Sequence, residues 1–110
     1  MTMLSADTLK NESVVNPQGE DLGNVRDFML NTDSGQIAYA VLSFGGFLGM
    51  GDKYFAVPMS ALKLDTEKKC FILNADKERL KDAPGFDKNH WPNFADPAIT
   101  RKFDTYYSHR

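Results

Sequence analysis

The stretch QIAYAVLSF, residues 36–44, constrains how this chain can fold more than any other, because it is apolar on both faces of a strand. Side chains alternate between the two faces of a strand, and here both sets are apolar: Ile37, Tyr39 and Val41 on one face, and Ala38, Ala40, Leu42 and Phe44 on the other. Such a strand must be covered on both sides, which predicts a central place in a small barrel or sandwich.

Five further strand signals lie close together between residues 13 and 75, with turn residues between them. They are SVVN at 13–16, DLGNVRDFML at 21–30, KYFAVP at 53–58, KLD at 63–65 and CFILNA at 70–75. Short strands at this spacing predict a mainly β fold, a small antiparallel barrel or sandwich of about six strands. No segment alternates strands with long helices, so a doubly wound α/β fold is not expected.

Helices are predicted only as short pieces around these strands. Ser5 can cap a single turn that runs through Leu9, and residues 59–62 fit a helical turn or corner. Residues 76–83 read as a short helix that Pro84 and the following glycine end.

The C-terminal segment predicts a longer, amphipathic helix. Asp96-Pro97 makes a favourable start, with a capping carboxylate and proline at the first helical position. Ile99, Phe103 and Tyr106 then fall on one stripe at helical spacing. The stripe must be covered, either by the chain's own strands or by another chain. We therefore expect a barrel domain at residues 1–92 and a helical tail at residues 93–110.

A glycine-rich stretch, GGFLGMG at residues 45–51, raises the question of phosphate binding. It matches neither GxxxxGK[ST] nor GxGxxG, and a strand-like FAVP follows it where a phosphate loop would lead into a helix. A wide hairpin loop fits better. Its apolar residues Phe47, Leu48 and Met50 either fold back as a lid over one end of the barrel or form an exposed patch for a partner.

Composition and charge exclude several kinds of partner. The chain has 110 residues and a net charge of −2, which suits one domain and gives no strongly basic face for direct nucleic-acid binding. No apolar run approaches the roughly 20 residues needed to cross a bilayer, and no secretory signal is evident, so a cytoplasmic location is expected. Cys70, the only cysteine, lies in the apolar run CFIL and is expected to be a buried thiol.

Catalytic constellations are scarce. No CxxC, HExxH or GxSxG motif occurs, and neither His90 nor His109 has a neighbour at the spacing that a metal site needs. We expect no enzyme activity, no metal and no cofactor. Asp27 is a separate case because it lies between Val25 and Met29 within a strand. If it faces inward it must find hydrogen-bond donors, so we expect a structural role for it.

The stretch VVNPQGEDLGNVRDFMLNTDSGQIAYAVLSFGGFLGMGDKYFAVPMSAL closely resembles the PRC-barrel family. The shared pattern is a glycine after the first turn, here Gly23, then a strand with Asp27, a polar turn ending in Gly35, an AYAVLSFGG strand and GDKYFAVP. The resemblance extends through LKLDTEKKCFILNADKERLKDAPGFDKNHWP, similar to stand-alone bacterial members, and covers roughly residues 4–92. It implies a small, strongly bent β-barrel of about six strands that binds other proteins and has no family-wide catalytic residues.

The leading interpretation is a protein-interaction or assembly module that forms a homodimer. The candidate interface residues are apolar or aromatic, and intramolecular packing is the alternative for each of them: Phe47, Leu48, Met50, Trp91, Phe94, Phe103, Tyr106 and Tyr107. A second interpretation, by analogy with the photosynthetic reaction-centre H subunit, is a small-molecule or cofactor binder linked to electron transport. A third, by analogy with a ribosome maturation factor, is contact with a ribosomal protein. Both named proteins contain PRC-barrel domains.

Overall fold

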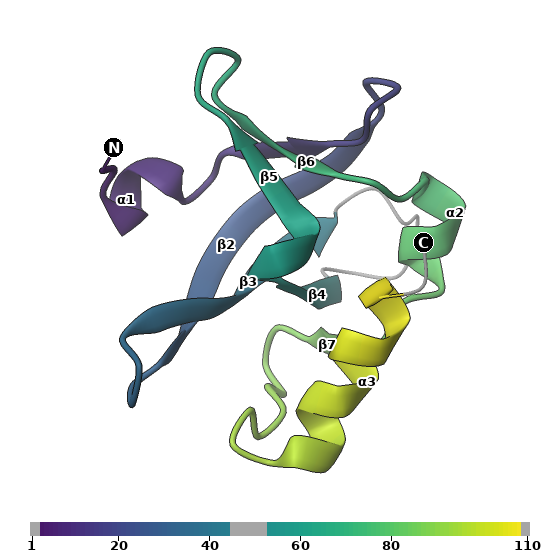
Figure 1. Cartoon of the computed structure of the whole chain (residues 1–110). Helices are drawn as coiled ribbons and strands as arrows, with labels where there is room; N and C mark the ends of the chain where they lie inside the picture. The colour runs from purple at the N-terminus through teal and green to yellow at the C-terminus, as the bar shows by residue number, and fades with distance from the viewer. Residues whose placement is uncertain (1–2, 45–52, 109–110) are drawn as a thin grey trace.

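A computed structural model describes residues 3–44 and 53–108 of the chain as one seven-stranded sheet with short helices around it (Figure 1). The strand order is β5-β6-β1-β2-β3-β4-β7. Neighbouring strands are antiparallel, except that β1 and β6 are parallel. The strands are β1 (Ser13–Val15), β2 (Asp21–Asn31), β3 (Gln36–Phe44), β4 (Lys53–Pro58), β5 (Leu62–Asp65), β6 (Cys70–Leu73) and β7 (Gly85–Asp87).

The fold is mainly β, as the sequence predicts, but the sheet is not closed into a barrel within the described residues. β5 and β7 form its two edges, and each pairs with a single neighbour. All six predicted strands are present. The seventh, β7, was not predicted, because Pro84-Gly85 reads as the end of the preceding helix and only three residues of strand follow.

The helices begin where the capping residues predict. The hydroxyl of Ser5 accepts the N–H of Thr8 at the start of α1 (Ala6–Leu9), and the Asp76 carboxylate accepts the N–H of Arg79 at the start of α2 (Lys77–Lys81). Asp96 accepts the N–H of Ala98 at 2.9 Å at the start of α3 (Pro97–Ser108). A 3₁₀ turn, η1 (Met59–Ala61), follows β4 at the predicted corner.

Strand β3 is buried on both faces, which confirms its predicted central place. One face joins the main core, whose fully buried side chains include Val14, Leu22, Val25, Leu42, Phe55, Val57, Phe71 and Leu80. The other face joins a second cluster built on Tyr39, Ala56 of β4 and Phe103 of α3. α3 therefore covers the second face of the sheet, beside β4 and β7 in Figure 1.

Two irregularities in the pairing of β2 with β3 break the simple alternation expected for these strands. Val25 pairs with Leu42 and Asp27 with Val41, so Arg26 is an extra residue on β2. A bulge of this kind turns the side chains that follow it to the opposite face. As a result Asp27, expected on the face of buried Val25, is exposed, and the following Phe28 is buried in its place.

Asp27 thus faces outward, and the structural role expected for it stays a prediction. Its Oδ1 accepts the N–H of Phe28, its own neighbour, at 2.7 Å. The second irregularity lies on β3. Met29 pairs with Tyr39 and Leu30 with Ile37, which leaves Ala38 extra and places Ala38 with Tyr39 on the α3 side, while Ile37 joins the main core.

The turn from β1 to β2 is organised by a buried amide. Asn16 is 2 % exposed, and its Oδ1 accepts the N–H groups of Gln18 and Glu20 at 3.1 and 2.8 Å. Its Nδ2 donates to the Glu20 carboxylate at 2.7 Å. All the polar atoms of the buried amide are thus satisfied, as burial requires.

Gly23 permits a close approach of β2 to the backbone of β3. It has φ of +113°, and a Cβ at this position would lie 2.2 Å from the carbonyl oxygen of Ser43. Gly19 also has positive φ, at +87°, but has open space around its Cα. Glycine is therefore required at position 23 for two reasons, the positive φ and the lack of space for a Cβ beside Ser43. At position 19 only the positive φ requires it.

We expect Gly23→Ala to lower the free energy of unfolding by about 3 kcal/mol, because it adds a backbone clash to an unfavourable φ. Gly19→Ala, the matched control, should cost only about 1 kcal/mol. Urea denaturation followed by circular dichroism measures both. Equal losses would show that the contact with Ser43 has no effect on stability.

Candidate interaction surface

The C-terminal segment places a row of aromatic rings over β3, β4 and β7. Phe94 lies centrally, with ring centroids 5.9 Å from Tyr39 and 5.7 Å from Phe103. On its other side it lies 6.1 Å from Phe86 of β7 and 6.5 Å from Trp91. Aromatic pairs at such distances contribute about 0.5–1.5 kcal/mol each beyond the area that they bury. These aromatic contacts therefore hold the C-terminal segment against the sheet.

Trp91 forms the outer end of this row. The centroid of its ring lies 5.2 Å from that of Phe86 and 5.8 Å from that of Tyr54 in β4. Its Nε1 donates a hydrogen bond to the carbonyl oxygen of Lys88 at 2.7 Å. The residue is nevertheless 39 % exposed. A large ring that is supported on one side and open to solvent on the other has the character of an interface anchor.

An open hollow of about 570 Å³ continues this surface toward the β2–β3 hairpin. Leu30, Tyr39 and Phe94 are among the side chains that line it, and Leu30 is 59 % exposed. Leu30 and Trp91 thus flank Phe94, one across the hollow and the other by ring contact. We call Leu30, Phe94 and Trp91 the apolar surface.

The predicted interface residues divide into three groups. Phe47, Leu48 and Met50 lie outside the described residues. Phe103 and Tyr107 are each 4 % exposed and pack within the chain, as the alternative to an interface role expects. Trp91 is exposed, while Phe94 and Tyr106 are half-buried.

A polar contact fixes α3 within the second cluster. The hydroxyl of Tyr39 donates to Oδ1 of Asp104 at 2.7 Å. Burial, followed by the hydrogen bond and negative charge of Asp104, raises the pKa of Tyr39 from its ordinary value near 10 to about 12. The contact joins residues 65 positions apart and sets the rotation of the helix over β3.

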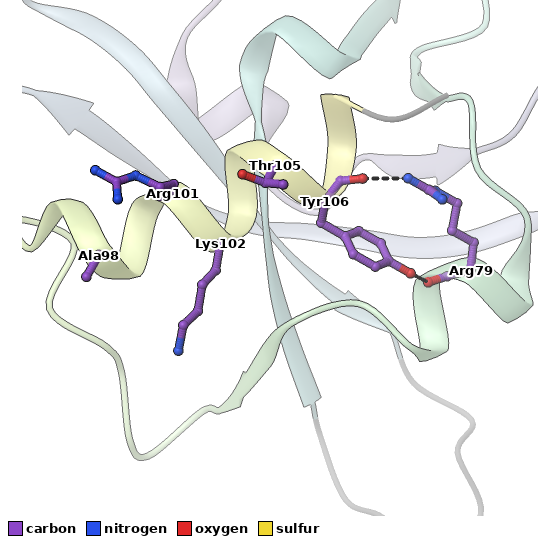
Figure 2. A pocket seen from close by; sticks show the side chains of 6 residues that line it. All are labelled: Arg79, Ala98, Arg101, Lys102, Thr105 and Tyr106. Atoms are coloured by element: carbon purple, nitrogen blue, oxygen red, sulfur yellow. Dashed lines mark hydrogen bonds between the residues drawn. The ribbon is translucent and has the colours of Figure 1, made fainter.

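A second contact joins α3 to α2. The guanidinium of Arg79 donates to the carbonyl of Tyr106 and lies over its ring, 4.7 Å from the centroid. The hydroxyl of Tyr106 donates in return to the carbonyl of Arg79 (Figure 2). Beside this contact is an open hollow of about 510 Å³, lined by Arg79, Ala98, Arg101, Lys102, Thr105 and Tyr106.

Tyr107, next to this contact, has a different environment. Its hydroxyl is buried and finds no hydrogen-bond partner among the residues that the structure describes. Burial raises the pKa of Tyr107 well above its ordinary value. Two adjacent tyrosines therefore differ sharply, one with a satisfied hydroxyl and one without.

The described residues bear on the sequence-based expectations for a metal site, for Cys70 and for membrane spans. No group of three or more His, Cys, Asp or Glu residues within 3–44 and 53–108 is placed to hold a metal ion. Cys70 is buried, as predicted. Among the helices of this part of the chain, none has the length and apolar character needed to span a bilayer.

A family model described as the PRC-barrel domain matches residues 1–80. The chain belongs to the PRC-barrel family. This confirms the family predicted from the sequence, although the match ends before the predicted limit of residue 92. No curated protein matches the chain. The PRC-barrel match covers α1 to most of α2 and leaves out β7, Trp91, Phe94 and α3, so most of the aromatic row lies outside it.

Sequence reasoning missed three parts of this region. Leu30 is not distinguished by its sequence neighbours, because only the folded hairpin brings it to the hollow that Phe94 also lines. The contacts of Tyr39 with Asp104 and of Arg79 with Tyr106 join residues far apart in sequence, and no local pattern pairs them. The signal available was the density of aromatic residues after Pro84, which identified Trp91 and Phe94 but not what they contact.

We expect Asp104→Asn to lower the pKa of Tyr39, because the substitution removes the negative charge and retains a hydrogen-bond acceptor. The value should stay above its ordinary level, since burial remains. In the unsubstituted chain the raised pKa contributes stability below about pH 10 that is lost as the pH rises toward about 12. Carbon-13 NMR of ring-labelled tyrosine measures the titration. An unchanged pKa in the variant would contradict the assigned role of Asp104.

Tyr106→Phe and Tyr107→Phe remove the same atom from adjacent residues and should have different effects. Tyr106→Phe loses the hydrogen bond to the Arg79 carbonyl and should lower the free energy of unfolding by about 1 kcal/mol. Tyr107→Phe removes an unsatisfied buried hydroxyl, so stability should stay level or rise by up to about 1 kcal/mol. Urea denaturation of both variants tests this, and a marked loss in Tyr107→Phe would show that its hydroxyl has a partner.

Proposed function

We propose that this PRC-barrel chain is a non-enzymatic protein-interaction or assembly module that forms a homodimer through the apolar surface. The observation that carries the proposal is that exposed Leu30 of β2 lines the same hollow as Phe94, and that Phe94 is in ring contact with exposed Trp91. Exposed apolar side chains that gather around one hollow mark a contact site more reliably than scattered ones do.

Exposure supports this choice of surface. Among the described residues, the large hydrophobic side chains with high exposure are Met3, Leu4, Leu30 and Trp91. Two of these four flank Phe94, and the other two lie together near the N-terminus, where Leu4 lines a separate hollow with Leu9 and Leu64. The surface around Phe94 is the one with aromatic anchors, which carry most binding energy in protein interfaces.

A homodimer fits because a two-fold axis brings the same patch of each copy together. Each copy would then cover the other's Leu30 and Trp91 without a dedicated second partner. The aromatic row beneath the surface holds Trp91 and Phe94 in place before contact, which lowers the ordering cost of association.

The hollow beside Leu30 also supports a second candidate, a small-molecule binder. Its volume of about 570 Å³ lies within the range of ligand pockets, and the Tyr39 ring and the polar residues Asn31, Thr32 and Asp33 line it. Native mass spectrometry of freshly purified protein separates the candidates: an added non-protein mass favours the small molecule, and a doubled chain mass alone favours the dimer.

We expect Leu30→Asp to weaken the dimer about tenfold or more, because it places a charge within an apolar contact. Size exclusion with light scattering over a concentration series measures the dimer dissociation constant. Met3→Asp, at a residue that is 81 % exposed, is the matched control and should leave the constant unchanged.

Two outcomes would overturn this proposal. One is a wild-type chain that stays monomeric throughout the concentration series. The other is a dimer that Met3→Asp disrupts as much as Leu30→Asp does. Circular dichroism of both variants confirms that each keeps the wild-type fold.

A further inference from the structure

The outward face of α3 forms one wall of the hollow drawn in Figure 2. Ala98, Arg101, Lys102 and Thr105 follow one another at intervals of three, one and three residues, so they share one side of the helix. Arg79 and the ring of Tyr106 close the other end. Figure 2 shows Arg101 and Lys102 extending away from the helix in different directions, with Arg79 of α2 beside Tyr106 at the other end of the view.

The positive charges of Arg101 and Lys102 on α3 are not neutralised by nearby acidic residues. Both side chains are exposed, and within residues 3–44 and 53–108 neither has an Asp or Glu close enough for an ion pair. The acidic residues of the same helix region have other partners. Asp104 accepts the hydroxyl of Tyr39, and Asp96 accepts the N–H of Ala98.

Arg79 differs from these two because it is held in place. Its donation to the Tyr106 carbonyl and its position over the Tyr106 ring fix the guanidinium at the end of the hollow. The positively charged rim of the hollow is therefore fixed in place at Arg79, and two exposed side chains, Arg101 and Lys102, extend it along α3.

The surfaces between these cations are largely apolar. Ala98 is small, which leaves room beside the helix, and the ring of Tyr106 and the aliphatic stems of Arg101 and Lys102 are apolar parts of residues that line the hollow. A site of this kind favours a ligand with negative charges on either side of an apolar group.

The charge distribution along the chain agrees with this assignment. Residues 77–110 contain seven Lys and Arg against five Asp and Glu, whereas residues 1–76 contain six against ten. The C-terminal part is thus weakly basic in a chain that is acidic as a whole, and its positive charge includes the rim of the hollow.

We propose that the hollow between α2 and α3 binds an acidic peptide segment of a protein partner, with carboxylates paired to Arg101 and Lys102 and an apolar side chain placed over Ala98. The inference deepens the proposed interaction role but uses a surface separate from Leu30 and Trp91. A nucleic acid suits the hollow less well. Phosphate backbones are bound by many cations, and the chain is acidic overall.

The test is selection of a displayed library of random 12-residue peptides on the full chain. Selected peptides should be enriched in Asp and Glu flanking an apolar residue. A selected peptide, synthesised with a fluorescent label, should bind the double variant Arg101→Glu/Lys102→Glu about tenfold more weakly, since two exposed ion pairs are lost and two repulsions added. Raising the salt concentration should weaken its binding to the wild-type chain.

The matched control is Lys63→Glu/Lys68→Glu, which changes net charge equally at two exposed residues on and beside β5. It should bind the peptide nearly as well as the wild-type chain does. Leu30→Asp should also bind the peptide normally, so failure of the dimer proposal and failure of this one give different results.

Three outcomes would overturn the proposal. The first is selection of peptides without acidic enrichment, and the second is equal weakening by both charge-reversed double variants. The third is loss of the homodimer in Arg101→Glu/Lys102→Glu, which would make the hollow an interface between copies. Binding of a 20-nucleotide single-stranded DNA that the same variant abolishes, with no acidic peptides selected, would assign the hollow to a phosphate polymer instead.

Discussion

Burial of β3 on both faces is the constraint on which the rest of the structure depends. A strand with apolar residues on both sides needs two separate coverings, and a single bent sheet supplies only one. The main core, on one face, uses the sheet's own curvature with residues such as Val25, Leu42 and Phe55. The other face requires an additional element, and α3 provides it by placing Phe103 beside Tyr39 and Ala56. The aromatic row and both contacts of α3 follow from that requirement.

The alternation of apolar residues predicted six strands, since each is short, local and bounded by turn residues. The alternation predicted the wrong face for side chains where one extra residue changed the pairing between β2 and β3. The bulge at Arg26 exposes Asp27 and buries Phe28, and the extra Ala38 moves Ile37 to the main core. Sequence alone does not locate such bulges, because each depends on the register between two strands. β7 was missed for a related reason: its three residues pair with β4 only after α2 has turned the chain back.

The candidate site could be predicted only in part. Aromatic composition identified Trp91 and Phe94, since large rings in a polar, irregular segment need something to cover them. It also selected Phe103 and Tyr107, which the fold buries, because a ring that meets the sheet and a ring that meets solvent have the same local pattern. Leu30, Arg101 and Lys102 have no distinguishing neighbours in sequence. Only the fold makes them candidates: it brings Leu30 to the hollow that Phe94 lines, and it pairs the Asp104 carboxylate with Tyr39 instead of with Arg101 or Lys102.

The placement of α3 after every strand of the sheet has a consequence for synthesis of the chain. Domains begin to fold from the N-terminal side while they are being translated. The strands can therefore pair and bury most of the main core before residues 97–108 exist, and until then Tyr39 and Ala56 lack the cover that Phe103 provides. A nascent chain at that stage would present an apolar sheet face to chaperones and to other nascent chains. Closure by α3 would then be the step that ends its exposure to aggregation.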